Sequence, residues 1–85
     1  MRVVGCFLEQ NNKFVILLRH SHKPHGNTWG LPGGKIEAGE NDESAIIREL
    51  FEETGYKAKP SELEKLSEHD FYPEGKHFIY VTFRV

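Results

Sequence analysis

Hydrophobic and polar positions alternate in blocks along the chain, and their spacing separates strands from a helix. Residues 2–9 and 13–19 are two β-rich runs with the polar turn Gln10-Asn11-Asn12 between them, which predicts a hairpin. The second run is apolar without interruption from Phe14 to Leu18. Such a run favours a strand that is covered on both faces.

The middle of the chain predicts one helix, from about residue 42 to residue 54. Asn41 is suited to the N-cap position, and Asp42 and Glu43 favour the first helical turn. Gly55 is placed to end the helix. A polar loop and the short extended stretch 29–32 precede the pair Gly33-Gly34 that leads toward this helix.

The C-terminal third predicts a second hairpin. A strand is expected around residues 63–71, followed by a turn at 73–76 and an apolar run at 77–85. The chain of 85 residues is long enough for one small domain. Because it stops inside an apolar run without a turn or cap, we expect this single domain, residues 1–85, to be C-terminally incomplete.

The predicted helix has two chemically different sides. At about 100° per residue, the apolar side holds Ile46, Ile47, Leu50, Phe51 and Thr54. The opposite side holds Arg48, Glu49, Glu52 and Glu53, with only Ala45 among them. Carboxylates at this spacing repel one another, whereas clustered oxygen ligands suit Mg²⁺ or Mn²⁺. The alternative is a solvated acidic face; the glycine pair upstream and Arg48 favour the metal site.

Residues 34–56, GKIEAGENDESAIIRELFEETGY, carry the most functional information. They match the pattern G-x5-E-x7-R-E-U-x-E-E-x-G-U (U, apolar) and so resemble the signature of the Nudix hydrolases. Seven fixed residues in register arise by chance on the order of once in 10^8 windows. Tyr56 replaces the more usual aliphatic residue after the motif glycine and is apolar enough to pack there.

The resemblance implies an α/β fold, in which a mixed sheet carries the motif helix on one face. The family's α/β/α sandwich has further strands and a second helix that this chain is expected to lack. It also implies a catalytic set made of Arg48 and the three glutamates. The implied metal ligands are the Gly34 carbonyl and the carboxylates of Glu49, Glu52 and Glu53.

The roles of the neighbouring residues follow from the same resemblance. Glu49 is the first candidate for the general base, although some members place the base on a later loop. Arg48 is expected to orient a glutamate, and Glu40 to tie the loop to the helix or to Arg48 from outside the metal shell. Lys35 and Arg19 are candidate phosphate partners, with simple solvent exposure as the alternative for each.

The implied reaction is attack of water on phosphorus in a nucleoside diphosphate linked to another group. Nucleoside triphosphates and ADP-ribose are examples of such substrates, and Mg²⁺, or alternatively Mn²⁺, is the implied cofactor. The rival hypothesis is a non-catalytic module that binds a nucleotide or a protein on a partial fold.

Charge and composition limit the kinds of partner and the cellular location that we expect for this protein. Net charge is −2 with both signs interspersed, which argues against a nucleic-acid polymer or a membrane surface. The single cysteine, Cys6, lies in an apolar run and is expected in the core. The N-terminal apolar stretch is too short for a signal peptide, so we expect a cytoplasmic protein. An uncovered sheet edge or face would favour a homodimer.

Other residues have two interpretations each. His20, His22 and His25 form a possible zinc site, but without cysteines a surface cluster is favoured. Trp29 either stacks on a base or, as we expect, packs under the helix. Tyr72 and Pro73 lie where the family carries residues that mark subfamilies, and the pair does not decide the substrate.

Overall fold

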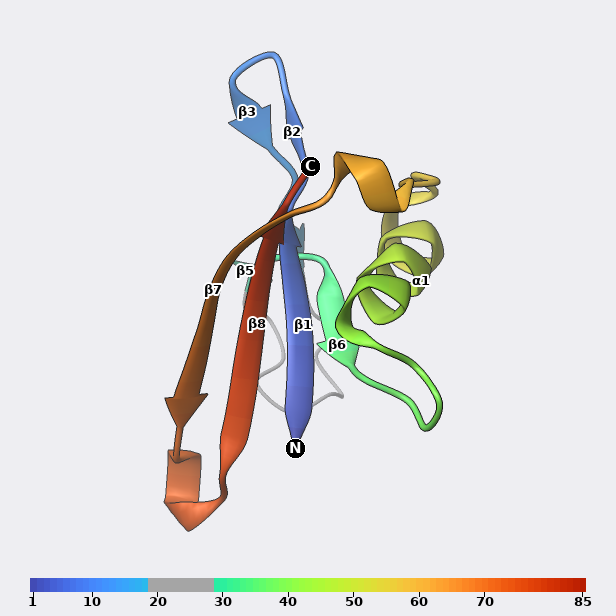
Figure 1. The fold of residues 1–85 in the computed structure, drawn as a ribbon. Helices are drawn as coiled ribbons and strands as arrows, with labels where there is room; N and C mark the ends of the chain where they lie inside the picture. Colours follow the sequence, from blue (N-terminus) through green and yellow to red (C-terminus); the bar gives the residue numbers. More distant parts are fainter. Residues whose placement is uncertain (19–28) are drawn as a thin grey trace.

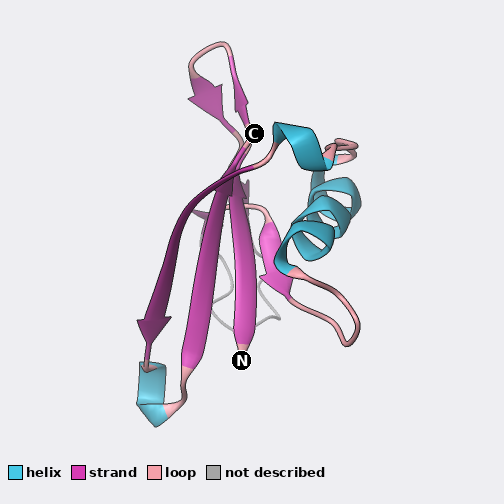
Figure 2. Ribbon diagram, in the orientation of Figure 1, coloured by secondary structure: helices cyan, strands magenta, loops and turns pink. Residues whose placement is uncertain are grey.

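The structure is a computed structural model that describes residues 1–18 and 29–85. Its centre is a four-stranded mixed sheet with the order β6-β1-β8-β7. The strands are β1 (Arg2–Phe7), β6 (Gly33–Lys35), β7 (Glu64–Phe71) and β8 (Phe78–Arg84). Helix α1 (Asp42–Thr54) lies against one face of this sheet (Figures 1 and 2). The predicted α/β class, with the motif helix on one face of a mixed sheet, is confirmed.

Two antiparallel pairs and one parallel pair build the sheet. β1 pairs antiparallel with β6, where Val4 lies opposite Gly34. β1 pairs parallel with β8, from Arg2 opposite Ile79 to Phe7 opposite Arg84. β7 and β8 form the predicted antiparallel hairpin, closed by the short 3₁₀ turn η2 (Pro73–Gly75). The first and last strands of the chain are therefore central neighbours.

The predicted N-terminal hairpin is present as two very short strands. β2 (Glu9–Gln10) pairs with β3 (Lys13–Phe14), and Asn11 and Asn12 turn the chain with φ values of 54° and 63°. Asparagine tolerates this left-handed region better than most residues, and such a two-residue turn matches the twist of a hairpin.

The prediction that the run from Phe14 to Leu18 forms a strand covered on both faces is wrong. The run contains the end of β3 and the separate strand β4 (Leu17–Leu18), and Phe14, Ile16 and Leu18 are 52%, 47% and 54% exposed. Both short strands lie outside the central sheet, each in a two-stranded sheet of its own, and so do not share the core that α1 covers. An apolar run alone does not reveal this, because it does not show which elements lie beside it.

Trp29 was expected under the helix, and this prediction is also wrong. It lies in β5 (Trp29–Gly30), pairs with Leu18 of β4 and is 63% exposed. β5 belongs to its own two-stranded sheet and not to the sheet that α1 covers. Its place just before the glycine pair therefore does not bring it beneath the helix.

Helix α1 begins and ends as predicted. The Asn41 side chain accepts a hydrogen bond from the Ser44 amide at 2.8 Å, and the Ser44 hydroxyl accepts from the Asn41 amide at 3.0 Å. This reciprocal cap satisfies two amides that the helix leaves unpaired. Gly55 ends the helix in the left-handed conformation, with φ 81°. A 3₁₀ turn, η1 (Pro60–Glu62), then leads into β7.

The core lies between α1 and the sheet. Its buried residues come from β1, α1, β8 and the segment after the helix, and they are Val4, Cys6, Ala45, Ile46, Leu50, Ala58, Val81 and Phe83. Two positions differ from the helical projection: Ala45 is fully buried, and Phe51 is 51% exposed. The side of α1 that packs on the sheet therefore includes the small Ala45 and leaves Phe51 half exposed. Within the described ranges, no helix is both long and apolar enough to cross a bilayer.

Cys6 is fully buried, as predicted, and burial raises the pKa of its thiol to about 11. At pH 8 such a thiol is a thiolate in roughly one molecule in a thousand, and only the thiolate reacts. We expect Ellman's reagent to label the native protein far more slowly than the same protein in urea. Rapid stoichiometric labelling without urea would show that the sheet opens around β1.

Candidate metal centre

The glycine pair of β6 lies beneath the acidic side of α1. Gly34 is so close to Glu49 that a Cβ atom on Gly34 would lie 2.6 Å from Glu49 Oε1 and 2.8 Å from Glu49 Cδ. The absent side chain thus leaves the room that the carboxylate occupies. The Glu49 side chain is only 12% exposed. A glycine is required at position 34 because the Glu49 carboxylate lies so close to the backbone. β6 itself is held in place by its pairing with the central strand β1.

The other two helical carboxylates differ in exposure and contacts. Glu53 Oε1 accepts a hydrogen bond from the Gly33 amide at 2.7 Å, so it also faces the glycine pair. Glu52 is 54% exposed, and its carboxylate lies 3.3 Å from Arg48 Nη1. Glu49 and Glu53 therefore both lie against the backbone of the glycine pair, whereas the Glu52 side chain is exposed to solvent.

Arg48 links the helix to the loop that precedes it. Its Nε and Nη2 atoms donate to Glu40 Oε2 and Oε1 at 2.7 and 3.0 Å. Nη1 donates to Glu49 Oε1 at 2.9 Å, and Nη2 also donates to the Lys35 carbonyl at 3.1 Å. These contacts hold the guanidinium in a fixed plane, because its donors are arranged as a rigid fork.

Charge pairing in this cluster favours the ionised forms. Hydrogen bonds from Arg48, and then from the Glu37 amide, lower the pKa of Glu40 below its usual value. Hydrogen bonds with Glu40, and then with Glu49 and Glu52, raise the pKa of Arg48. Arg48 therefore stays charged, and Glu40 serves it as an acceptor.

The donor set suits a hard divalent cation, because its side-chain donors are carboxylate oxygens. Glu49 and Glu53 both lie against the glycine pair, where Gly34 adds its backbone carbonyl to the residues that could hold an ion. Among residues 1–18 and 29–85, however, no three acidic, histidine or cysteine side chains are already grouped as a metal cage. Glu49 is bound to Arg48 and Glu53 to the Gly33 amide, so the ligand chemistry fits a metal although the cage is not assembled.

The candidate phosphate partners and the candidate zinc ligands remain to be placed. The side chain of Lys35 is exposed beside the cluster, and only its carbonyl contacts Arg48. Arg19 and the histidines His20, His22 and His25 lie outside the described residues.

Sequence reasoning missed one acidic residue of the cluster. The Glu37 carboxylate lies 3.6 Å from Arg48 Nη1, and its amide donates to Glu40 Oε1 at 2.9 Å. Its spacing of three residues from Glu40 is the signal that could have indicated it.

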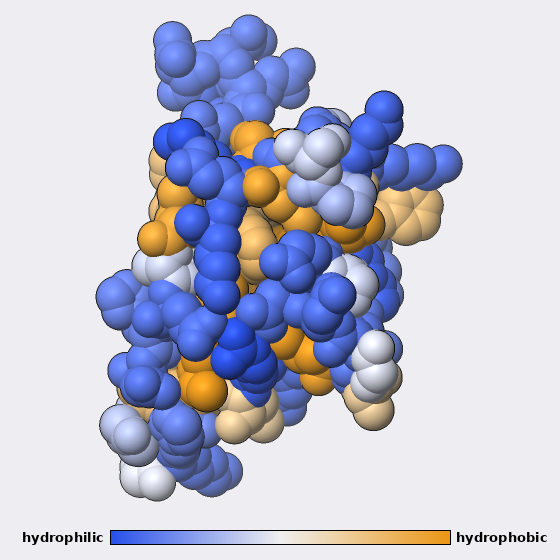
Figure 3. All heavy atoms as spheres, in the orientation of Figure 1, coloured by the Kyte–Doolittle hydropathy of each residue, from blue (hydrophilic) through white to orange (hydrophobic). Residues whose placement is uncertain are grey.

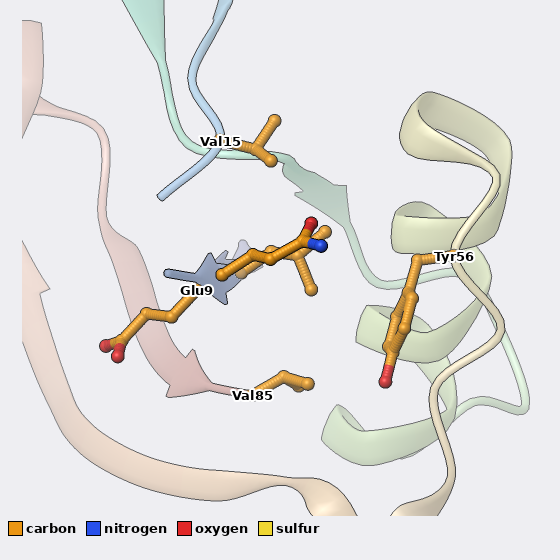
Figure 4. A pocket seen from close by; sticks show the side chains of 6 residues that line it. Glu9, Val15, Tyr56 and Val85 are labelled. Carbon is orange, nitrogen blue, oxygen red and sulfur yellow. The ribbon is translucent and has the colours of Figure 1, made fainter. Parts of the chain in front are cut away.

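A separate hollow of about 410 Å³ opens near the end of α1. Tyr56, from the segment after the helix, lines one side of it, and Val15 and Val85 line others (Figure 4). Tyr56 is 36% exposed, and its hydroxyl donates to Glu62 at 2.5 Å, so the residue packs with its ring only. On the face seen in Figure 1, hydrophobic side chains reach the surface between hydrophilic ones (Figure 3).

Comparisons with known proteins identify relatives. A family model described as the NUDIX domain matches residues 1–85. An ADP-ribose pyrophosphatase of Methanocaldococcus jannaschii is 39% identical over 81 residues, which are 94% of this chain and 47% of that protein. An 8-oxo-dGTP diphosphatase of Escherichia coli is 38% identical over 68 residues, which are 80% of this chain and 53% of that protein.

A solved structure shows the same fold. The crystal structure of a MutT NUDIX hydrolase from Burkholderia pseudomallei superimposes with a TM-score of 0.82 at 26% identity. The match covers 99% of this chain and 64% of that one. The present chain spans about half of the length of the two relatives from Methanocaldococcus jannaschii and Escherichia coli.

Proposed function

This chain belongs to the NUDIX family, and from that membership and the geometry of its acidic helix we propose that it hydrolyses nucleotides. The reaction is the Mg²⁺-dependent cleavage of a diphosphate bond in a nucleoside diphosphate linked to another group. The observation that carries the proposal is the contact of two helical carboxylates, those of Glu49 and Glu53, with the glycine pair of β6.

Each residue has a role that its contacts support. The carboxylates of Glu49, Glu52 and Glu53 and the Gly34 carbonyl would hold the ion. A bound divalent cation neutralises phosphate charge and lowers the pKa of water. The Glu49 side chain is 12% exposed and that of Glu52 is 54% exposed, and the more buried Glu49 is the first candidate to accept the proton of the attacking water. Arg48 orients Glu49, and Glu40 orients Arg48 from outside the metal shell.

The substrate is a small nucleotide. The two relatives are named for ADP-ribose and for 8-oxo-dGTP, which share a nucleoside diphosphate unit and differ in the group attached to it. The exposed Lys35 beside the cluster, together with Arg19, supplies positive charge for the phosphates. The specific nucleotide depends on groups around the base, to which the acidic cluster contributes nothing.

A hydrolysis panel tests the proposal. Triphosphates, ADP-ribose, dinucleoside polyphosphates and sugar nucleotides are incubated with and without Mg²⁺, and the products are separated by chromatography. We expect turnover of at least one class, only with metal, and a nucleoside monophosphate among the products. Turnover of none of them by folded protein would overturn the proposal and favour a non-catalytic binding module.

Mg²⁺ should raise the melting temperature if the helical carboxylates bind it in the folded state alone. At a concentration one hundred times the dissociation constant, mass action adds about 2.7 kcal/mol of stability. Thermal unfolding is compared with and without Mg²⁺ at matched ionic strength, and Glu53→Gln serves as the variant whose response is reduced. An unchanged melting temperature at high Mg²⁺ would contradict a tight site in the folded protein.

A further inference from the structure

Arg2 contacts both ends of the segment between β6 and α1, here called the β6–α1 loop (residues 36–41). At the start of the loop, the Arg2 carbonyl accepts a hydrogen bond from the Ile36 amide at 3.1 Å. At its end, Arg2 Nε and Nη2 donate to the two carboxylate oxygens of Asp42, each at 2.8 Å. Asp42 is the first residue of α1, so one residue of β1 joins the two points where the loop leaves and re-enters regular structure.

The guanidinium is held by more than one partner. Arg2 Nη2 also donates to Glu68 Oε1 of β7 at 2.7 Å, and Lys65 Nζ donates to the same oxygen at 2.9 Å. The Asp42 side chain is only 16% exposed, and that of Arg2 is 35% exposed. Two partners and a two-point contact with Asp42 set this group apart from an isolated surface ion pair, which contributes little.

The β6–α1 loop carries Glu40. Within the loop, the Glu40 amide donates to the Glu37 carbonyl at 3.1 Å, and the Glu40 carboxylate accepts from the Glu37 amide at 2.9 Å. Glu40 in turn binds Arg48 through two hydrogen bonds. Figure 1 shows this loop swinging away from the sheet between the end of β6 and the start of α1. Its internal bonds fix its shape, and contacts at its ends fix where it lies.

We propose that Arg2 is a positioning residue: its backbone carbonyl holds the start of the β6–α1 loop, and its side chain holds the end of the loop through Asp42, which keeps Glu40 in place to orient Arg48. The inference rests on the proposed function only for its consequence in turnover. The geometry of the loop is a property of the protein without metal or substrate, and it is tested in that state.

The test is amide hydrogen exchange of the metal-free protein, followed residue by residue by NMR. In Arg2→Met, which retains much of the aliphatic stem, we expect the Glu37 and Glu40 amides to exchange roughly tenfold faster, since local opening reports local stability. The amides of Val81 and Phe83 in the core should keep their rates. Asp42→Asn should give the same pattern, and the double variant should add little to either single one.

Two controls separate positioning from general stability. Arg84→Met removes another contact between an arginine and a carboxylate, that of Arg84 with Glu64, without touching the loop. Glu68→Ala removes the second acceptor of Arg2 and leaves the two-point contact with Asp42 in place. Both should leave the exchange of Glu37 and Glu40 close to that of the unchanged protein.

Equal acceleration of every amide in Arg2→Met, or loop rates matching those of Arg84→Met, would overturn the proposal. If the protein hydrolyses nucleotides, Arg2→Met should also raise the Mg²⁺ concentration that gives half-maximal rate, and Arg2→Lys should restore it only in part, because lysine lacks the two-point geometry. Failure to find any substrate affects this last measurement alone, and the exchange result stands independently of it.

Discussion

Replacing Glu53 by glutamine is expected to reduce metal-dependent turnover by roughly a hundredfold or more, because a catalytic metal contributes several kcal/mol and each factor of ten is about 1.4 kcal/mol. Glutamine is nearly the same size and keeps an oxygen that accepts from the Gly33 amide, the contact made at 2.7 Å by Glu53. The substitution therefore removes one negative charge with little change to the backbone. Steady-state rates over a range of Mg²⁺ concentrations measure the effect.

The matched control for this variant is Glu43→Gln, on the same helix but in its exposed first turn. It removes the same charge away from the glycine pair and should cost at most a small loss of helix stability. Unchanged metal-dependent turnover in Glu53→Gln would exclude this carboxylate from the site. An equal loss in both variants would show that overall charge, and not a ligand, is responsible.

Gly34→Ala is expected to lower turnover by roughly one to two orders of magnitude, the cost of misplacing a catalytic group by about 1 Å. The added Cβ would lie 2.6 Å from Glu49 Oε1, so the carboxylate has to move. The larger side chain in Gly34→Val should abolish activity. Circular dichroism is expected to show that α1 survives in both variants, because the helix is capped and packed independently of this contact.

Gly30→Ala is the control for the glycine substitutions, because a Cβ at Gly30 would meet no described atom within 4 Å. It should retain both helical signal and turnover. If Gly34→Ala also retained full turnover, the close approach of Glu49 to the glycine pair would have no part in catalysis. Loss of helical signal would show instead that the substitution acts by unfolding.

Much of the fold follows from local signals in the sequence. Helix α1 was predicted with its bounds because Asn41 and Gly55 are residues with strong preferences for those two positions. The β7–β8 hairpin was predicted because Pro73 and Gly75 mark the turn between the strand expected around residues 63–71 and the apolar run at 77–85. Each of these signals acts over a few neighbouring residues, so a single sequence displays it.

The parts that were missed depend on distant residues. The run from Phe14 to Leu18 is as apolar as a buried strand, yet its exposure depends on which layer lies beside it. Arg2 offered no signal at all, since its partner Asp42 lies 40 positions away and meets it only through the pairing of β1 with β6 and the packing of α1. Within the candidate site, the carboxylates and Arg48 were found from spacing, whereas the contact of Glu49 with Gly34 required the structure.

The parallel pairing of β1 with β8 also governs when this domain can fold. The first strand leaves the ribosome early, but its partner, from Phe78 to Arg84, is made only after α1 and β7. Val81 and Phe83, which complete the core, arrive with that partner. Joining two strands that are separated in sequence by α1 and β7 costs loop-closure entropy before any contact compensates for it, and such topologies fold slowly. The residues that cap the acidic helix are therefore made before the strand that completes its sheet, and the apolar face of α1 stays without part of its core until β8 has been made.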